Sequence, residues 1–236
     1  PERVRQALTE RTRAILINSP ANPTGTLLSD ERMKAVADMG REAGAFVVSD
    51  EIYHGLVYEG RERSILEFTD QAFVLNGFSK LYAMTGWRLG YVIAPKEFVR
   101  PMQRLSQNFF ISACSVSQWA GVAALTEAAA DVERMRRTYD ERRRLLLKRL
   151  KELGFGLGSE PTGAFYVLAN ARHLAAKFGG SSLKLAFDIL EKVHVGVTPG
   201  IDFGPGAEGY LRFSYANSLE NIEEGMARLA GYLERA

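Results

Sequence analysis

The sequence predicts an α/β fold with a mostly parallel sheet, followed by a smaller α+β domain. In the first half of the 236-residue chain, short continuous apolar runs alternate with helical or loop segments, as in sheets covered on both faces. In the second half, long helical patterns surround a few short apolar runs and a Gly- and Pro-rich loop. We therefore expect one domain over residues 1–128 and a second over residues 129–236.

Four buried strands are expected in the first domain, at residues 14–17, 45–48, 72–75 and 89–93. The first ends in a Ser-Pro-Ala-Asn-Pro loop, and Pro95 stops the fourth. Between the first two strands, Ser29 can cap a helix whose first turn carries Asp30 and Glu31, which suit the positive end of its dipole. Gly44 is typical of the residue that ends such a helix.

The second domain is expected to mix helices and short strands. The helical pattern runs from 115 to about 153, with a break near residue 130, and a second amphipathic helix covers 182–193. Asn217 can cap a final helix that reaches about residue 235. The strands are expected at 163–168, 195–197 and 210–214.

Composition excludes several classes of function. Lys and Arg number 30 against 28 Asp and Glu, so a net charge of +2 predicts no nucleic-acid or membrane partner. The basic run 134–149 alternates with leucines, so we interpret it as the solvated face of an amphipathic helix rather than a binding patch. No apolar run approaches the roughly 20 residues of a membrane span and no signal peptide is visible, so a cytoplasmic location is expected by default.

Cysteine and histidine usage gives no metal site. A single cysteine, Cys114, cannot form an internal disulfide, and we expect a small buried thiol rather than a nucleophile. The three histidines have no metal-ligand spacing.

Three polar residues follow the predicted strands closely: Asn22, Asp50 and Lys80. Ligands of parallel sheets bind beyond the carboxyl ends of the strands, so these side chains are expected to face one site. A lysine in such a place can form a Schiff base with a carbonyl cofactor, and the following Arg88 can bind an anionic group such as a phosphate.

Three motifs carry a resemblance to a known family. They are Asn-Ser-Pro-Ala-Asn-Pro-Thr-Gly at 18–25, Ser-Asp-Glu-Ile-Tyr at 49–53, and the stretch 76–91, which includes Asn-Gly-Phe-Ser-Lys and Met-Thr-Gly-Trp-Arg. In this order they resemble the class I aminotransferases, the aspartate aminotransferase-like enzymes that use pyridoxal 5′-phosphate (PLP) on fold type I. The resemblance runs from about residue 13 to the C-terminus, and it implies that residues 1–128 form the C-terminal part of the large PLP-binding domain.

The resemblance implies a role for each residue around the cofactor ring. Lys80 would form the Schiff base and move the proton between the substrate Cα and the cofactor. Asp50 would keep the pyridine nitrogen protonated, and Tyr53 and Asn22 would donate to the 3′-oxygen. Taken alone, Asp50 could equally cap a helix, and Pro20 and Pro23 could simply form a turn around Asn22.

Phosphate and substrate would be bound by other residues. Arg88 would bind the phosphate, with Ser79 as a less secure second donor. Many relatives carry a serine where this chain has Gly77, so the phosphate site is expected to lack one hydroxyl. Arg212 would bind the substrate α-carboxylate, and Asn22 would also bind the substrate; a structural ion pair is the alternative for Arg212.

Neighbouring residues are expected to play supporting parts: His54 packs or lies behind the ligand contacts, and Tyr82 and Trp87 pack around the lysine loop. The implied activity is transfer of an amino group from an amino acid, with aspartate as one candidate, to a 2-oxo acid. A PLP-dependent C–S lyase of the same fold and a PLP-sensing domain of a transcription regulator are the alternatives. The family also implies a homodimer.

The chain begins at Pro1, whereas the family carries a substantial region before the first motif. We therefore expect an N-terminally truncated chain that lacks the aromatic stacked on the PLP ring, the phosphate-binding helix and a tyrosine that reaches the phosphate from the partner subunit. Loss of strands from a sheet exposes edges and apolar faces, so association and little transaminase activity are expected of the isolated chain.

Overall fold

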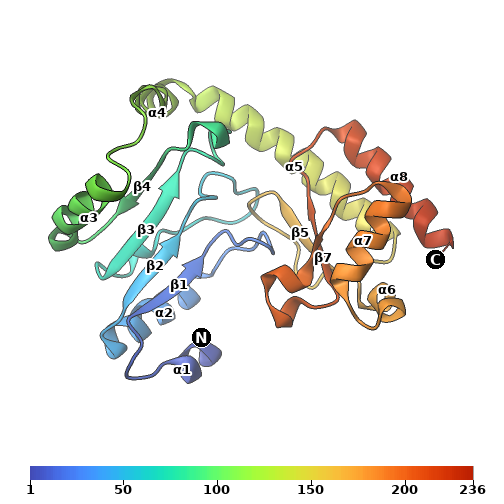
Figure 1. Ribbon diagram of the computed structural model, residues 1–236, viewed down its shortest axis with the longest axis horizontal. Coiled ribbons are helices and arrows are strands. Elements are labelled where there is room, and N and C mark those ends of the chain that lie inside the picture. Colours follow the sequence, from blue (N-terminus) through green and yellow to red (C-terminus); the bar gives the residue numbers. More distant parts are fainter. Residues whose placement is uncertain (236) are drawn as a thin grey trace. The chain divides into compact units, whose positions relative to one another are not determined.

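The computed structural model describes residues 1–235, which fold into two compact units (Figure 1). The first unit comprises Pro1–Pro20 and Leu27–Arg134, and the second comprises Ala21–Thr26 and the chain from Met135 onward. The expected domain boundary at 128/129 falls in the turn between α4 (Ser115–Glu127) and α5 (Ala129–Glu152). A division into domains at that point stays a prediction.

The first unit is built on a four-stranded sheet in the order β1-β2-β3-β4. Its strands are β1 (Ala14–Asn18), β2 (Phe46–Asp50), β3 (Ala72–Gly77) and β4 (Gly90–Ile93). The first three run parallel, and β4 pairs antiparallel with β3. The expected α/β fold with a mostly parallel sheet is therefore confirmed, and each predicted strand is found within about two residues.

One face of this sheet is covered by α2 (Asp30–Ala43). Met33, Val36 and Met39 of the helix pack against Val47 and Val74 of the strands, all nearly buried. As expected, the Ser29 hydroxyl accepts a hydrogen bond from the Arg32 backbone N–H (3.4 Å), and Gly44 ends the helix in the left-handed region at φ 61°. The sequence pattern therefore fixes both ends of α2.

Two helices of the first unit were not expected from the sequence, α1 (Glu2–Ala7) and α3 (Lys96–Phe109). The ring of Phe98 in α3 lies edge-on to Phe46 and Phe73, with centroids 5.2 Å apart in both pairs. No residue of α3 is fully buried, and β4 is exposed along its whole length. Exposed apolar side chains also occur on β1 and α4, where Leu16 is 71% and Trp119 75% exposed.

The second unit contains a three-stranded antiparallel sheet in the order β5-β7-β6. The strands are β5 (Tyr166–Asn170), β6 (Thr198–Pro199) and β7 (Tyr210–Ser214), and the helices beside α5 are α6 (Arg172–Ala175), α7 (Ser182–Val193) and α8 (Leu219–Arg235). Short 3₁₀ helices in the two units are η1 (Ile65–Glu67), η2 (Thr85–Trp87), η3 (Ala176–Phe178), η4 (Gly200–Phe203) and η5 (Pro205–Ala207). The predicted α7 and β7 are confirmed residue for residue.

Three details of the second unit differ from prediction. The strand expected at 163–168 starts only at Tyr166, because Ala164 has a φ of +56° that interrupts the extended chain. Residues 195–197 form no strand; only Thr198 and Pro199 pair with β7. Ser218, not Asn217, caps α8, because its hydroxyl accepts from the Asn221 backbone N–H (3.2 Å), whereas the Asn217 side-chain oxygen accepts from the Ser218 N–H (2.9 Å).

The run predicted to be a solvated face includes a buried arginine, and the prediction of a buried Cys114 is wrong. Arg143 lies in the basic run but is only 2% exposed, because it donates to Asp140 and to the Pro161 carbonyl oxygen (2.8 Å). Cys114 is exposed rather than buried, since it precedes the first turn of α4. Hydrogen bonds from the backbone N–H groups at the start of α4, first that of Ser117, lower the pKa of its thiol.

Candidate active site

The carboxyl ends of β1, β2 and β3 lie next to one another because the three strands are parallel. The Asn18 side-chain amide donates to the Asp50 carbonyl oxygen (2.9 Å), and the Glu51 N–H donates to the Leu75 carbonyl oxygen (2.9 Å). These bonds extend the pairing of the strands to their last residues. Asp50 is itself the last residue of β2 rather than the first residue after it.

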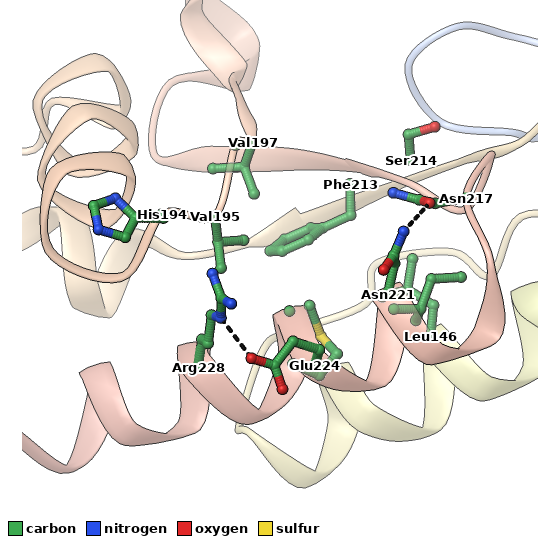
Figure 2. Close-up of a pocket in the computed structure, with 14 residues that line it drawn as sticks. Leu146, His194, Val195, Val197, Phe213, Ser214, Asn217, Asn221, Glu224 and Arg228 are labelled. Carbon is green, nitrogen blue, oxygen red and sulfur yellow. Dashed lines mark hydrogen bonds and ion pairs between the residues drawn. The ribbon is translucent and has the colours of Figure 1, made fainter.

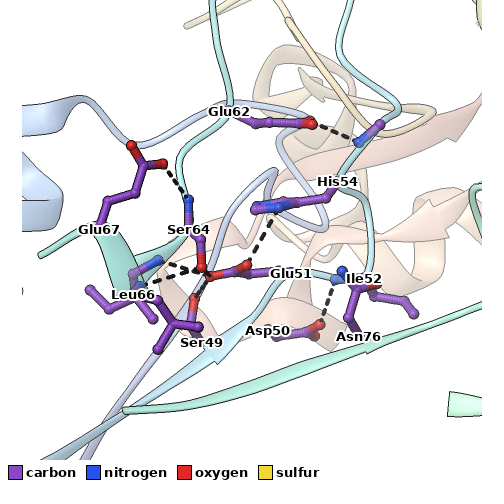
Figure 3. Close-up of polar contacts among 12 residues, drawn as sticks. Ser49, Asp50, Glu51, Ile52, His54, Glu62, Ser64, Leu66, Glu67 and Asn76 are labelled. Carbon is purple, nitrogen blue, oxygen red and sulfur yellow. Dashed lines mark hydrogen bonds and ion pairs between the residues drawn. The ribbon is translucent and has the colours of Figure 1, made fainter. Parts of the chain in front are cut away.

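The turn after β2 carries Asp50 and Tyr53. One Asp50 carboxylate oxygen accepts from the Ile52 backbone N–H (3.1 Å), as Figure 3 shows. Residues 51–54 form a turn and not a helix, so this contact orients the carboxylate without capping a helix. Asp50 is half-buried, and Tyr53 is 3% exposed.

A buried polar cluster lies directly behind this turn (Figure 3). At its centre the Glu51 carboxylate, 3% exposed, accepts from the hydroxyls of Ser49 (2.9 Å) and Ser64 (3.1 Å) and from the Ile65 backbone N–H (3.0 Å). His54 Nδ1 lies 3.4 Å from its second oxygen. Of this cluster, only His54 was placed behind the site from the sequence. The Ser-Asp-Glu-Ile-Tyr motif contains Glu51, but nothing in the motif identifies its distant partners, Ser64 and Ile65.

Lys80 lies in the loop after β3, and its ammonium is 6.0 Å from the centre of the Tyr53 ring. Lys80 is half-buried, and its loop is fixed by backbone contacts: Phe78 N–H donates to Leu89 O and Met84 N–H donates to Phe78 O, both at 3.2 Å. Lys80 and Tyr53 are 27 positions apart in the sequence, and the structure brings the lysine close to the turn after β2.

Arg88 and Ser79 lie in the same loop. Arg88 is exposed, adopts a φ of +51°, and donates to the Thr85 carbonyl oxygen (3.2 Å). The Thr85 hydroxyl in turn donates to the Ser79 carbonyl oxygen (3.0 Å). The structure explains why glycine occupies position 77. A Cβ there would lie 2.9 Å from the Leu89 carbonyl oxygen and 3.0 Å from the Gly90 Cα, so a serine would require the β3–β4 pair to shift.

The aromatic neighbours of the loop differ in burial. Tyr82 packs against Phe78 and Met84, as expected. Trp87 remains 45% exposed, although its carbonyl oxygen accepts from the Ser117 hydroxyl (2.7 Å) and so ties the loop to α4.

In the second unit, Arg212 and Asn22 are in direct contact. The Arg212 guanidinium donates to the Asn22 side-chain oxygen (2.8 Å) and to the Thr198 hydroxyl (3.0 Å). It lies 4.2 Å from the centre of the Tyr166 ring and 5.0 Å from that of Phe203. The structure thus brings together Arg212 and Asn22, both of which were expected to bind the substrate, although their mutual contact was not predicted. Thr198, Tyr166 and Phe203 were not identified from the sequence.

Arg212 has the properties of an anion-binding residue. Within residues 1–235 no carboxylate forms an ion pair with it, and its Nε is buried without a hydrogen-bond partner. A guanidinium offers five N–H donors, and a carboxylate from outside the chain would satisfy those left over. This arrangement speaks against the alternative of a structural ion pair.

A groove of about 280 Å³ lies elsewhere in the second unit, between α8 and residues 194–197 (Figure 2). Its polar lining pairs internally: Arg228 donates to Glu224 (2.8 Å), and Asn221 donates to Asn217 (2.9 Å). Phe213 lines the groove, whereas Arg212, the preceding residue of β7, points to the other face of the strand. The groove is therefore separate from the Arg212 site.

Metal-binding clusters and membrane-spanning helices are both absent from the described part of the chain. Among residues 1–235 there is no group of three or more His, Cys, Asp or Glu that could hold a metal ion. In the same part of the chain, no helix has both the length and the apolar character needed to span a membrane.

Comparison with known proteins defines the class. The chain is 40% identical to a solved Thermus thermophilus aspartate aminotransferase (a double mutant), with a TM-score of 0.91 over 98% of this chain and 59% of that one. It is 37% identical to an aromatic aminotransferase from Pyrococcus horikoshii, with a TM-score of 0.93 over 99% of this chain and 63% of that one. The fold is therefore that of the type I PLP-dependent transferases.

Sequence comparison identifies the family. The profile described as "Aminotransferase class I and II" matches residues 1–229, so the chain belongs to this PLP-dependent family. Curated relatives include a (5-formylfuran-3-yl)methyl phosphate transaminase from Methanocaldococcus jannaschii, 42% identical over 99% of this chain and 61% of the relative. An aspartate/prephenate aminotransferase from Thermus thermophilus is 41% identical over 100% and 60%. The chain thus spans about three fifths of the length of these relatives.

The side chains of the first unit fit the family's cofactor by their chemistry. An oriented carboxylate (Asp50), a buried phenol (Tyr53) and a half-buried amine (Lys80) come from two neighbouring strand ends. An acid, a donor and a nucleophile are the kinds of side chain that PLP needs from a protein, so these residues are chemically compatible with it.

Proposed function

We propose that the protein is a PLP-dependent aminotransferase that transfers an amino group from an L-amino acid to a 2-oxo acid. The observation that carries the proposal is the Lys80 ammonium 6.0 Å from the ring of Tyr53, in the same turn as the oriented Asp50 carboxylate. When bound, the cofactor withdraws electrons from the substrate Cα and makes its proton acidic.

Each residue of the chain has a defined task in this proposal. Lys80 would hold the cofactor through its amine and would move the proton of the substrate Cα. Asp50 would keep a proton on the ring nitrogen, and Tyr53 would donate to the ring oxygen. Arg88 binds the phosphate, with Ser79 as the second donor; its exposed guanidinium supports this role.

Arg212 binds the substrate carboxylate, and Asn22 fixes one edge of the guanidinium. The stacking of Arg212 between Tyr166 and Phe203, and its unpaired buried Nε, support this assignment. Because relatives act on aspartate and prephenate by name, dicarboxylic and aromatic amino-acid pairs are the first substrates to test. A homodimer and a cytoplasmic location remain predictions.

The direct test is chemical labelling of the full product of the gene. The protein is incubated with PLP, reduced with borohydride, digested and mapped by mass spectrometry, with Lys80→Ala as the control. A single label at Lys80 that the control lacks is the expected result. Labels scattered over surface lysines would refute the assignment of Lys80.

Activity is tested next with L-aspartate and 2-oxoglutarate, and with aromatic donors. Formation of the new amino acid from the acceptor supports amino transfer. Release of pyruvate from a cystathionine-like substrate, without any 2-oxo acid acceptor, would instead indicate β-elimination and overturn the proposal.

A further inference from the structure

The Glu51 carboxylate has an unusual position for a charged group. It is 3% exposed and stands between Asp50 and Tyr53 in the chain, the two residues proposed to hold the cofactor ring. A buried carboxylate is costly unless several donors reach it. Here one oxygen accepts three hydrogen bonds, from Ser49, Ser64 and Ile65, at 2.9 to 3.1 Å.

These bonds tie the turn after β2 to the capped 3₁₀ helix η1. Ser64 and Ile65 begin η1, where the Ser64 hydroxyl also accepts from the Leu66 N–H and the Glu67 side chain accepts from the Ser64 N–H (3.2 Å). Ile65 is completely buried in the core beneath the sheet. The Glu51 side chain therefore joins the turn to a segment that is anchored in the core by Ile65.

The second carboxylate oxygen restrains the far end of the turn. His54 Nδ1 lies 3.4 Å from it, and Figure 3 shows the imidazole and the carboxylate facing each other. Ser49 and His54 thus bracket Asp50 and Tyr53, and both contact the same carboxylate. The single hydrogen bond of the Asp50 side chain to the Ile52 N–H lies inside this bracket.

We propose that Glu51 is a positioning residue, which holds Asp50 and Tyr53 in the orientation that binds the cofactor ring. The inference rests on the proposed function, because it assumes that Asp50 and Tyr53 contact PLP. The Glu51 carboxylate itself points into the cluster with Ser49, Ser64 and His54.

Two substitutions of Glu51 separate its shape from its charge. In Glu51→Gln the amide oxygen can still accept from the Ile65 N–H, the serine hydroxyls can rotate, and the NH₂ group can donate to a neutral His54. In Glu51→Ala the buried Ile65 N–H and both hydroxyls lose their acceptor. Glu67→Ala is the control, because it removes another acceptor of the same η1 segment without touching the turn.

The measurements are the PLP dissociation constant, the visible circular dichroism of bound PLP, and urea unfolding of each variant without PLP. For Glu51→Ala we expect PLP binding to weaken by about tenfold or more, with a reduced visible dichroism. Glu51→Gln should recover binding to within about threefold. Glu67→Ala should keep both cofactor signals of the wild type.

Several outcomes would overturn the inference. If Glu51→Ala binds PLP and shows visible dichroism like the wild type, the inference is refuted. Equal losses of cofactor signal in Glu51→Ala and Glu67→Ala would also refute it, because they would indicate a general loss of structure. If Glu51→Ala does not fold, Ser49→Ala, which removes one donor to Glu51, decides: unchanged binding refutes the inference, and weaker binding with reduced dichroism supports it.

The two proposals fail in different ways. If the wild-type protein takes up no label at Lys80, the proposed function falls, and the role of Glu51 falls with it. If Lys80 is labelled but the Glu51 variants bind PLP like the wild type, only the inference about Glu51 is refuted.

Discussion

Arg143 and Arg144 allow a matched test of how burial changes the contribution of an ion pair to the free energy of unfolding. Both guanidiniums bond to Asp140 at 2.7 Å, but the Arg143 side chain is 3% exposed and that of Arg144 is 72% exposed. Arg143→Met should lower the free energy of unfolding by about 3 kcal/mol, because the Pro161 carbonyl and Asp140 lose a buried donor. Arg144→Met should change it by less than about 1 kcal/mol. Equal values in urea unfolding would contradict this account.

Gly25 and Gly44 form a second pair at the scale of one residue. Both have positive φ, +66° and +61°, but a Cβ on Gly25 would lie 2.4 Å from the Pro161 Cβ, whereas a Cβ on Gly44 meets nothing within 4 Å. Gly44→Ala should cost about 1 kcal/mol, the strain of a left-handed alanine. Gly25→Ala should cost at least about 3 kcal/mol. Unfolding in urea compares the two variants, and a Gly25→Ala as mild as Gly44→Ala would refute the proposed clash.

Residue types at the candidate site could be predicted, but their partners could not. The three motifs place Asp50, Tyr53 and Lys80, and the predicted strand at 210–214 carries Arg212. Arg212, however, contacts Asn22 across 190 positions of the sequence. Such contacts depend on how strands and turns pack in three dimensions, and one sequence carries no local signal for them. The motifs alone support only the assignment by resemblance.

At the scale of elements, Asp188 of α7 joins that helix to α8. It accepts a hydrogen bond from the Tyr232 hydroxyl (2.7 Å) and pairs with Lys192 (2.9 Å). These contacts, first that with Tyr232, lower the pKa of Asp188 below its ordinary value of 3.8. A depressed carboxyl pKa stabilises the folded state at pH values above the unfolded pKa, and this contribution is lost as pH falls through the folded pKa.

Asp188→Asn should therefore be less stable than the wild type near pH 7, and the difference should shrink as pH falls below 3.8. Urea midpoints of both proteins, measured from neutral pH into this acidic range, provide the comparison. Lys192→Met is the control, since it keeps the bond to Tyr232 and removes only the more exposed partner. A difference between wild type and Asp188→Asn that does not change with pH would rule out the carboxylate as its source.

The elements that were predicted correctly have their signals within the chain segment itself. The helix α2 has a serine cap, acidic residues in its first turn and a closing glycine, and β1 to β3 are continuous apolar runs. The helix α3 was missed because Pro101 lies inside it, and proline is typical of helix ends rather than helix interiors. The antiparallel direction of β4 was not predicted either, since a strand's direction depends on the path of the loop before it.

At the scale of the whole chain, uncovered apolar surface is the main physical liability. Phe109, Phe110 and Ile111, at the end of α3, are 71 to 82% exposed, and Trp119 of α4 is 75% exposed. Large exposed apolar side chains that lie close in sequence favour association, because water is released when they are covered. We expect the 236-residue chain to form dimers or larger species at micromolar concentration and to bind an apolar fluorescent dye.

The substitution Phe110→Lys combined with Trp119→Lys tests this expectation directly. Both side chains are exposed in the folded unit, so their replacement should leave the fold intact while it reduces dye binding and shifts the chain toward the monomer in sedimentation. Arg144→Lys plus Lys148→Arg, on exposed positions of α5, preserves charge and serves as the control. If the double lysine variant associates as strongly as the wild type, the surface of α3 and α4 is not responsible. The exposed edge strand β4 would then be the next region to test, with a charged residue in place of Val92.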